Sequence, residues 1–403
     1  MARAAAFRTD AHSIALWSLA FRPFFLAASL WAALALLLWM ILFVSGIAFP
    51  SRFDPLTWHI HAMLFGFVLA VIAGFILTAI PNWTGRTPVG GGSLVALVTL
   101  WFIGRIACVM SAFLPLWLAA AIDIAFPVAL CSVAVCEIVA ARNWRNLMIP
   151  VPIGVLAIAD LLMYLELAGF DMPPGFGWRL ALAAAIALLS AIGGRIIPPF
   201  TRNWLVSRGS ALKPVSHRWL DQLALVTLHG GLLGWAFLPA SRPIGGVLLL
   251  AAILNLWRLA GWRGFATASE PLLSILHVGY GWVVLGAALL GASMLSDIVP
   301  EPAAIHAFTA GAIGTMVLAV MTRVSRGHTG RALEADGVTI SIYTFVVIAG
   351  LARVAAAFAD ARSVQLLEIS ALLWVTSFGL FAISYGPMLI SPRADHHEPL
   401  DQR

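Results

Sequence analysis

Twelve runs of about 20 mostly apolar residues follow one another along the sequence. A run of this length is enough to cross the hydrocarbon core of a bilayer as an α-helix, which satisfies all its backbone polar groups internally. The connections between the runs are short and leave no room for a soluble domain. The expected spans are residues 24–45, 58–80, 93–112, 114–136, 147–166, 178–200, 219–238, 243–262, 271–292, 303–323, 338–358 and 366–390.

The composition supports membrane residence. Hydrophobic residues make up 61% of the chain and charged residues only 10%, whereas a soluble chain carries about 25% charged residues. This excludes an ordinary soluble, disordered or coiled-coil protein. The sequence therefore predicts one all-α domain over residues 1–403, a polytopic bundle of about 12 helices between residues 24 and 390, with short polar tails at 1–20 and 391–403.

The basic residues predict an orientation rather than a nucleic-acid partner. Although the net charge is +6, the basic residues are scattered singly between apolar runs and form no basic face. With a cytoplasmic N-terminus, 17 Lys and Arg residues fall in cytoplasmic segments and five in the opposite loops. Because cytoplasmic loops carry an excess of Lys and Arg, both termini are expected in the cytoplasm. The lipid bilayer is thus the expected partner, and nucleic acid is not.

An internal resemblance relates the second expected span to the tenth. Residues 60–86 and 305–331 align without gaps at an offset of 245, with seven identities in 27 positions. Residues 197–201, at the end of the sixth span, resemble residues 80–84 at the end of the second. Spans two, six and ten are four apart, so three four-helix units are one interpretation. The alternative is that helix ends share Gly, Thr and Arg for local reasons.

Five of the ten histidines lie within the expected spans, namely His59, His61, His229, His277 and His306. Ionisable residues inside a bilayer are costly and indicate function. Neutral imidazole binds haem iron or copper without adding charge. For a single such histidine a hydrogen-bonding role is an equal alternative, but five together favour a haem or metal protein.

Depth divides these histidines into two expected layers. His59, His61 and His306 lie at the outer ends of spans two and ten, whereas His229 and His277 lie roughly 15 Å and 9 Å from the inner face. The internal resemblance makes His61 the partner of His306. His59 and His61 lie about 200° apart around a helix and cannot bind one metal from regular helical geometry.

His59 faces the same side of its helix as Met63, four residues later. An imidazole together with a thioether suits copper. The alternative is that Met63 is an ordinary core residue. The three cysteines, Cys108, Cys131 and Cys136, all fall in apolar runs without a CxxC pairing, and we interpret them as buried apolar residues.

Four other polar residues are expected at similar depth within the spans. Arg105 and Asp123 match in depth across the hairpin between spans three and four, which favours a structural ion pair over a proton path. Asp160 lies at similar depth on span five, with Tyr164 one turn further on. These residues form a candidate polar route from the outer face.

Several motifs resemble those of a known family, the NnrS proteins. They are WHIHAMLFGF at residues 58–67, PNWTG at 81–85, the stretch from His306 through GTMVLAVMTRVSRGHTGR at 314–331, and FRPFF at 21–25. The resemblance covers residues 17–390, and the third motif is long and specific. It implies a twelve-helix bacterial inner-membrane protein that contains haem and copper and is linked to resistance against nitric oxide and nitrosative stress.

The resemblance sets expectations for cofactors and site residues. His59, His61 and His306 match the family's motif positions, whereas His229 and His277 rest on the depth argument. Haem-binding residues are expected to be His61, His306, His229 and His277, with one or two b-type haems. Metal binding is expected from the same four residues together with His59 and Met63, with copper as the additional metal. Nitric oxide or a related small molecule and an unknown electron donor are the expected partners.

Three classes of function stay open. The first is a haem protein that binds nitric oxide or converts it as a membrane oxidoreductase. The second is a transporter, because twelve spans are common in transporters. A transporter would be expected to have two related six-helix halves. The resemblance between spans two and ten does not fit that arrangement. The third is a sensor or assembly factor that holds haem without catalysis.

Overall fold

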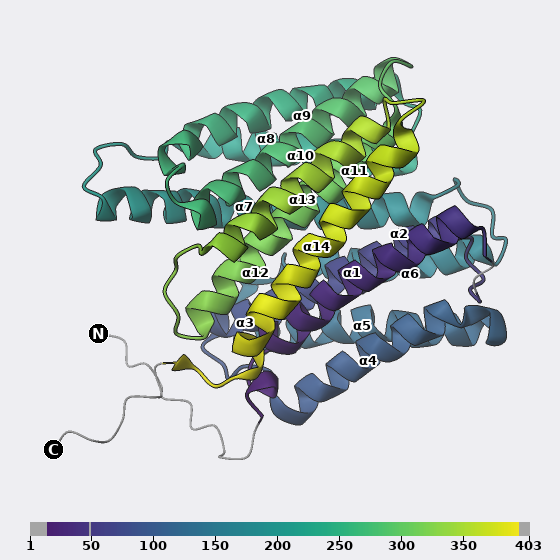
Figure 1. Ribbon diagram of the computed structural model, residues 1–403, viewed down its shortest axis with the longest axis horizontal. Helices are drawn as coiled ribbons and strands as arrows, with labels where there is room; N and C mark the ends of the chain where they lie inside the picture. Colours follow the sequence, from purple (N-terminus) through teal and green to yellow (C-terminus); the bar gives the residue numbers. More distant parts are fainter. Residues whose placement is uncertain (1–13, 48–49, 395–403) are drawn as a thin grey trace.

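The computed structural model describes residues 14–47 and 50–394, so most of the expected tails, at 1–13 and 395–403, lies outside the described residues. Twelve long helices make up the described chain (Figure 1). Ten of them are single elements: α1 (Phe21–Ser45), α4 (Gly91–Val109), α5 (Leu116–Ala140), α6 (Pro150–Leu167), α7 (Phe176–Ser207), α8 (Arg218–Phe237), α9 (Arg242–Gly261), α10 (Pro271–Leu295), α13 (Gly337–Ala356) and α14 (Ser363–Ile390).

The second and tenth long helices are each built from three consecutive segments. The second consists of α2 (Pro55–His61), the π-helical segment η2 (Ala62–Val68) and α3 (Leu69–Thr84). The tenth consists of α11 (Glu301–His306), the π-helical segment η6 (Ala307–Ile313) and α12 (Gly314–His328). Short 3₁₀ turns occur at Ala15–Trp17, Ser111–Phe113, Trp144–Asn146 and Gly264–Thr267.

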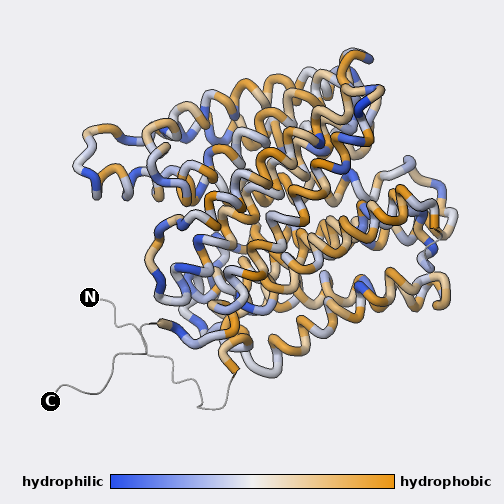
Figure 2. The backbone as a smooth tube through the Cα atoms, viewed as in Figure 1, coloured by the Kyte–Doolittle hydropathy of each residue, from blue (hydrophilic) through white to orange (hydrophobic). Residues whose placement is uncertain are grey.

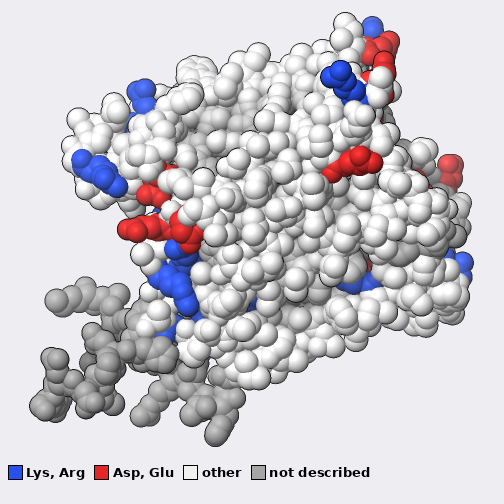
Figure 3. All heavy atoms as spheres, in the orientation of Figure 1, with Lys and Arg blue, Asp and Glu red and all other residues white. Residues whose placement is uncertain are grey.

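The twelve helices coincide with the twelve expected spans, and the fold prediction is confirmed. Eleven of the described helices are long and apolar enough to cross a membrane; α8 has the length but is more polar. Figure 2 shows hydrophobic residues along the helices. Figure 3 shows charged side chains mostly toward the two ends of the bundle, with a broad uncharged band between them. The chain is therefore a multi-pass membrane protein.

Spans two and ten form the centre of the bundle. The most apolar windows of Pro55–Thr84 and Glu301–His328 are 83% and 78% buried, against 33–44% for most other spans. The helix α7 packs against both η2 and η6, while α14 lies beside α1 and brings the two ends of the described chain together (Figure 1). We call the end at which α2, α7 and α11 begin the cavity end of the bundle.

The two π-helical segments support the internal resemblance found in the sequence. Ala62–Val68 and Ala307–Ile313 have the same length and are related by the same offset of 245 residues. Each follows directly after a histidine, His61 or His306. Because π-helical segments are rare and occur mostly at functional sites, a shared position in both helices marks this level of the bundle as a candidate site.

Two candidate histidine sites

A cavity of about 340 Å³ lies near the cavity end, between α1, η2, η6 and α14. Its wall is mostly apolar and includes Trp39, Phe67 and Trp374. The side chains of His59 and His306 both line it. We call this space the histidine cavity. It brings one histidine from each of the two central helices to a single apolar site.

A backbone carbonyl fixes the ring of His306. Its Nδ1 lies 2.8 Å from the carbonyl oxygen of Pro302, one turn earlier in α11. A carbonyl can only accept a hydrogen bond, so Nδ1 carries the proton and donates it. The lone pair is therefore on Nε2. Histidines that bind metals usually show this arrangement, in which the second ring nitrogen donates to a carbonyl or carboxylate.

The ring of His59 packs against an indole. The ring centroids of His59 and Trp39 are 4.5 Å apart at an interplanar angle of 31°. Within the described chain, the buried Nδ1 of His59 has no hydrogen-bond partner. Met63, one turn further on, lines the same cavity. A buried imidazole nitrogen without a partner is costly unless a ligand or an ion is bound at the site.

The cavity also contains a cation. Arg353, near the end of α13, lines the histidine cavity. Among the described residues it makes no hydrogen bond or ion pair. A guanidinium in a mostly apolar cavity is costly without a counter-charge. The histidine cavity therefore suits a ligand that combines an apolar body with an anionic group.

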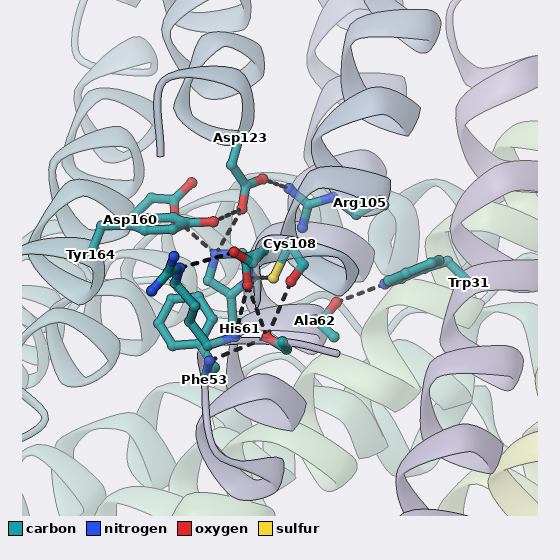
Figure 4. A network of polar contacts seen from close by, with 12 residues as sticks. Trp31, Phe53, His61, Ala62, Arg105, Cys108, Asp123, Asp160 and Tyr164 are labelled. Carbon is teal, nitrogen blue, oxygen red and sulfur yellow. Dashed lines mark hydrogen bonds and ion pairs between the residues drawn. The ribbon is translucent and has the colours of Figure 1, made fainter. Parts of the chain in front are cut away.

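A second site, the buried polar cluster, surrounds His61 on the other side of the same helix (Figure 4). Its Nε2 lies 2.9 Å from Oδ1 of Asp160 and 3.2 Å from Oδ2 of Asp123. Its Nδ1 lies 3.3 Å from Sγ of Cys108. The ring of Phe53 stacks on the imidazole ring of His61, with the two ring centroids 5.2 Å apart. His61 and both carboxylates are completely buried.

Two more residues complete the buried polar cluster. Arg105 forms an ion pair with Asp123, as the matched depth in the sequence predicts. Tyr164 donates a hydrogen bond of 2.8 Å to Oδ2 of Asp123. Oδ2 of Asp160 is buried and has no partner among the described residues. The expected polar route thus takes the form of a closed, buried network supplied by α4, α5, α6 and α2.

Three members of this cluster could hold a metal ion. One ligand atom each of His61, Cys108 and Asp123 lies within 4.8 Å of the others, and all three residues are buried. Imidazole, thiolate and carboxylate together are ligands of zinc and copper. The ion pair with Arg105 and the contact with Asp160 satisfy part of the cluster without a metal.

His229 and His277 are not brought together. His229 lies 2.9 Å from Oγ of Ser190, and His277 lies 2.9 Å from Oγ1 of Thr201. These two partners are 11 residues apart on α7, which is roughly 16 Å along a helix. The two histidines therefore do not form one deep site. Their roles as haem or metal ligands stay predictions.

The structure also separates His61 from His306. The sequence resemblance pairs these two residues, but His306 shares its cavity with His59, whereas His61 belongs to the buried polar cluster. The physical reason is the 200° between His59 and His61: one of them must turn away from the cavity. Packing decides which, because the carboxylates of α5 and α6 attract His61.

Two site residues escape the sequence reasoning. Cys108 is interpreted there as a buried apolar residue, and its burial is confirmed, but it also contacts His61. Arg353 is not singled out there, yet it belongs to α13 and lines the histidine cavity. One signal for Arg353 is available in the sequence, since it lies inside the expected span 338–358.

Fold and sites together define a polytopic membrane protein with two histidine sites on opposite sides of one central helix. The family model named NnrS protein matches residues 15–393, nearly the whole chain, and the chain belongs to this family. Comparison with curated proteins gives no match.

Proposed function

We propose that this protein binds haem in the histidine cavity and protects a bacterium from nitric oxide by binding or converting it, or a metal-nitrosyl product, at that haem. We place the protein in the bacterial cytoplasmic membrane with both termini in the cytoplasm. The family and the distribution of basic residues support this placement. The transporter and the non-catalytic sensor are the alternatives that the experiments below address.

The residues of the histidine cavity fit a haem. His306 offers Nε2 and His59 offers an imidazole whose Nδ1 lacks a partner. Apolar and aromatic walls suit a porphyrin face, and Arg353 supplies the positive charge that a haem carboxylate needs. Haem iron, when bound, supplies a position for nitric oxide and an exchangeable electron.

One observation carries this proposal. His59 from the second long helix and His306 from the tenth line the same mostly apolar cavity beside Arg353, which has no hydrogen-bond or ion-pair partner among the described residues. Among the described residues the buried Nδ1 of His59 has no partner, which core packing alone does not explain because such a nitrogen is costly in an apolar cavity. A ligand that binds imidazole and carries an anionic group beside Arg353 accounts for it.

Absorption spectroscopy of the purified protein tests the proposal. We expect a Soret band and a reduced-minus-oxidised haem signal, and we expect His59→Ala and His306→Ala to remove that signal. His217→Ala, in the loop before α8, is the matched control and should keep full haem content. Full haem content in both cavity variants, or no Soret band in the wild type, would contradict the proposal. Steady-state consumption of nitric oxide with an electron donor then separates an enzyme from a sensor.

The buried polar cluster is a second candidate site, and we propose that it holds copper. The close approach of His61, Cys108 and Asp123 favours this. Metal analysis of the purified protein should show copper that Cys108→Ala removes. Cys131→Ala, which changes a cysteine on α5 outside the cluster, should keep the metal. Equal copper content in the two variants would show that the cluster is an ion-pair network only.

A further inference from the structure

Three cavities follow one another along the second, sixth and tenth long helices. The histidine cavity is the first. A middle cavity of about 80 Å³ and a third cavity of about 300 Å³ continue from it toward the opposite end of the bundle. Arg323 and His328, near the end of α12, line the third cavity. The proposed haem uses only the first cavity and leaves the other two without a role.

Neighbouring cavities share wall residues. Val68 and Ile313 line both the histidine cavity and the middle cavity. Phe75, Ile196 and Val320 line both the middle and the third cavity. Side chains at two narrow levels, seven residues apart, therefore separate the three spaces. Seven residues are two helical turns, or about 10 Å.

The internal resemblance recurs at both narrow levels. Val68 and Ile313 are the last residues of η2 and η6, and the offset of 245 residues relates them. The same offset relates Phe75 to Val320. Equivalent faces of two helices thus form two walls of the middle cavity, and α7 forms a third through residues such as Ala185 and Ile192, while the space is partly open to the outside of the bundle. A regular arrangement of this kind differs from an accidental packing defect.

The wall of the middle cavity selects against ions and water. None of its lining side chains carries a nitrogen or oxygen atom, and Met316 supplies the only sulfur. A proton, a hydrated ion or a file of water molecules finds no hydrogen-bond partner there. With about 80 Å³ available, a haem is far too large. A diatomic gas molecule fits, because it is close in size to a water molecule, which occupies ~30 Å³ in the liquid.

We propose that the three cavities form an apolar passage along which a small uncharged molecule of the diatomic-gas class moves between the third cavity and the histidine cavity. Rotation of the side chains at the two narrow levels opens the way, because side chains change rotamer far faster than ligands turn over. The destination rests on the proposed function, since a gas has a binding partner in the histidine cavity only if haem is present there. The passage itself rests on the cavities alone.

Filling the middle cavity tests the passage. Ile192 on α7 lines only this cavity, and Ile192→Trp places an indole in it. Ile253→Trp is the matched control because Ile253 on α9 is 63% exposed on the outside of the bundle. Carbon monoxide rebinding after flash photolysis of the reduced protein gives the entry rate. We expect Ile192→Trp to slow rebinding about tenfold, which corresponds to ~1.4 kcal/mol of barrier, with haem content and control unchanged.

Xenon gives a readout that needs no haem. Dry apolar cavities bind xenon, so xenon-pressurised crystals of the wild type and of Ile253→Trp should show xenon in the middle cavity, and Ile192→Trp should not. A wild type without xenon there, or an unchanged rebinding rate in Ile192→Trp, would overturn the passage. A protein that binds xenon but contains no haem would contradict the proposed function and still support the passage.

Discussion

At the scale of single residues, the partners of each imidazole decide what it can do. His306 donates from Nδ1 to a carbonyl, which leaves Nε2 as a base or ligand in an apolar space. His61 faces two carboxylates through Nε2, and Arg105 pairs with one of them. His61 thus belongs to a network in which opposite charges are close together, whereas His306 and His59 face a cavity. The same side chain serves two different sites within one helix pair.

The buried ion pair predicts a large loss of stability when one partner is removed. Arg105→Met should lower the free energy of unfolding by roughly 3–5 kcal/mol, because it leaves buried negative charge without its guanidinium. Arg86→Met is the matched control: it breaks the ion pair of Arg86 with Glu137, whose side chains are 45% and 22% exposed, and should have little effect. Thermal unfolding in detergent measures both. Equal melting temperatures for the two variants would contradict this role of Arg105.

The sequence predicts part of this residue-scale organisation. Their matched depth across a hairpin predicts that Arg105 pairs with Asp123, because an unpaired charge inside a bilayer is costly. The choice between His59 and His61 for the cavity depends on which neighbouring helices carry the carboxylates, and one sequence does not reveal which helices are neighbours. For the same reason the contact between Cys108 and His61 joins residues 47 positions apart that no local pattern relates.

At the scale of elements, the π-helical segments depend on close tryptophan packing. A Cβ at Gly66 would lie 2.1 Å from Nε1 of Trp31, and one at Gly311 would lie 2.5 Å from the ring of Trp282. The indole of Trp31 also donates to the carbonyl of Ala62, at 2.9 Å. The offset of 245 residues relates the two glycines. In both segments a missing side chain therefore admits an indole.

Substitution of these glycines should destabilise the protein. Gly66→Ala and Gly311→Ala each force an indole to move, and we expect a cost of roughly 1–3 kcal/mol from overpacking. Gly379→Ala on α14 is the control, because a Cβ there meets nothing within 4 Å. Because alanine has a higher helix propensity than glycine, Gly379→Ala should instead raise the free energy of unfolding by up to ~1 kcal/mol. Melting temperatures compare the three variants, and a gain in stability for Gly66→Ala would refute the packing argument.

Helix positions follow from apolar runs, whereas the finer division of those helices does not. All twelve helices are predictable because a span needs about 20 mostly apolar residues, although α8 is more polar than the other eleven. The π-helical segments contain ordinary helix-forming residues such as Ala62 and Leu64, so their sequence does not distinguish them from α-helix. What distinguishes them is the packing of indoles from other helices, such as that of Trp31, which donates to the carbonyl of Ala62. The helix α7 likewise extends to Ser207, past the expected end at residue 200, because Pro198 and Pro199 are accommodated within it.

At the scale of the whole molecule, α8 decides whether the twelve-span topology holds. It is the one long helix of the described chain that is not apolar enough on its own. Its charge at Asp221 is 2.6 Å from Nε of Arg258 on α9, and Arg258 also donates to Tyr280 on α10. Asn255 accepts from the same tyrosine. These partners lower the cost of placing polar groups in a bilayer.

If α8 crosses the membrane, the loops at its two ends lie on opposite sides. Ala211→Cys, before α8, and Ala240→Cys, after it, introduce thiols at exposed positions. A membrane-impermeant maleimide applied to intact cells should label Ala240→Cys alone, and lysis should make Ala211→Cys reactive, because the excess of basic residues predicts that residues 208–217 lie in the cytoplasm. Wild-type protein treated with the same maleimide should stay unlabelled, which controls for the native cysteines. Labelling of both variants in intact cells would show that α8 lies along the surface. It would also reverse the expected direction of every later span, since each crossing fixes the next.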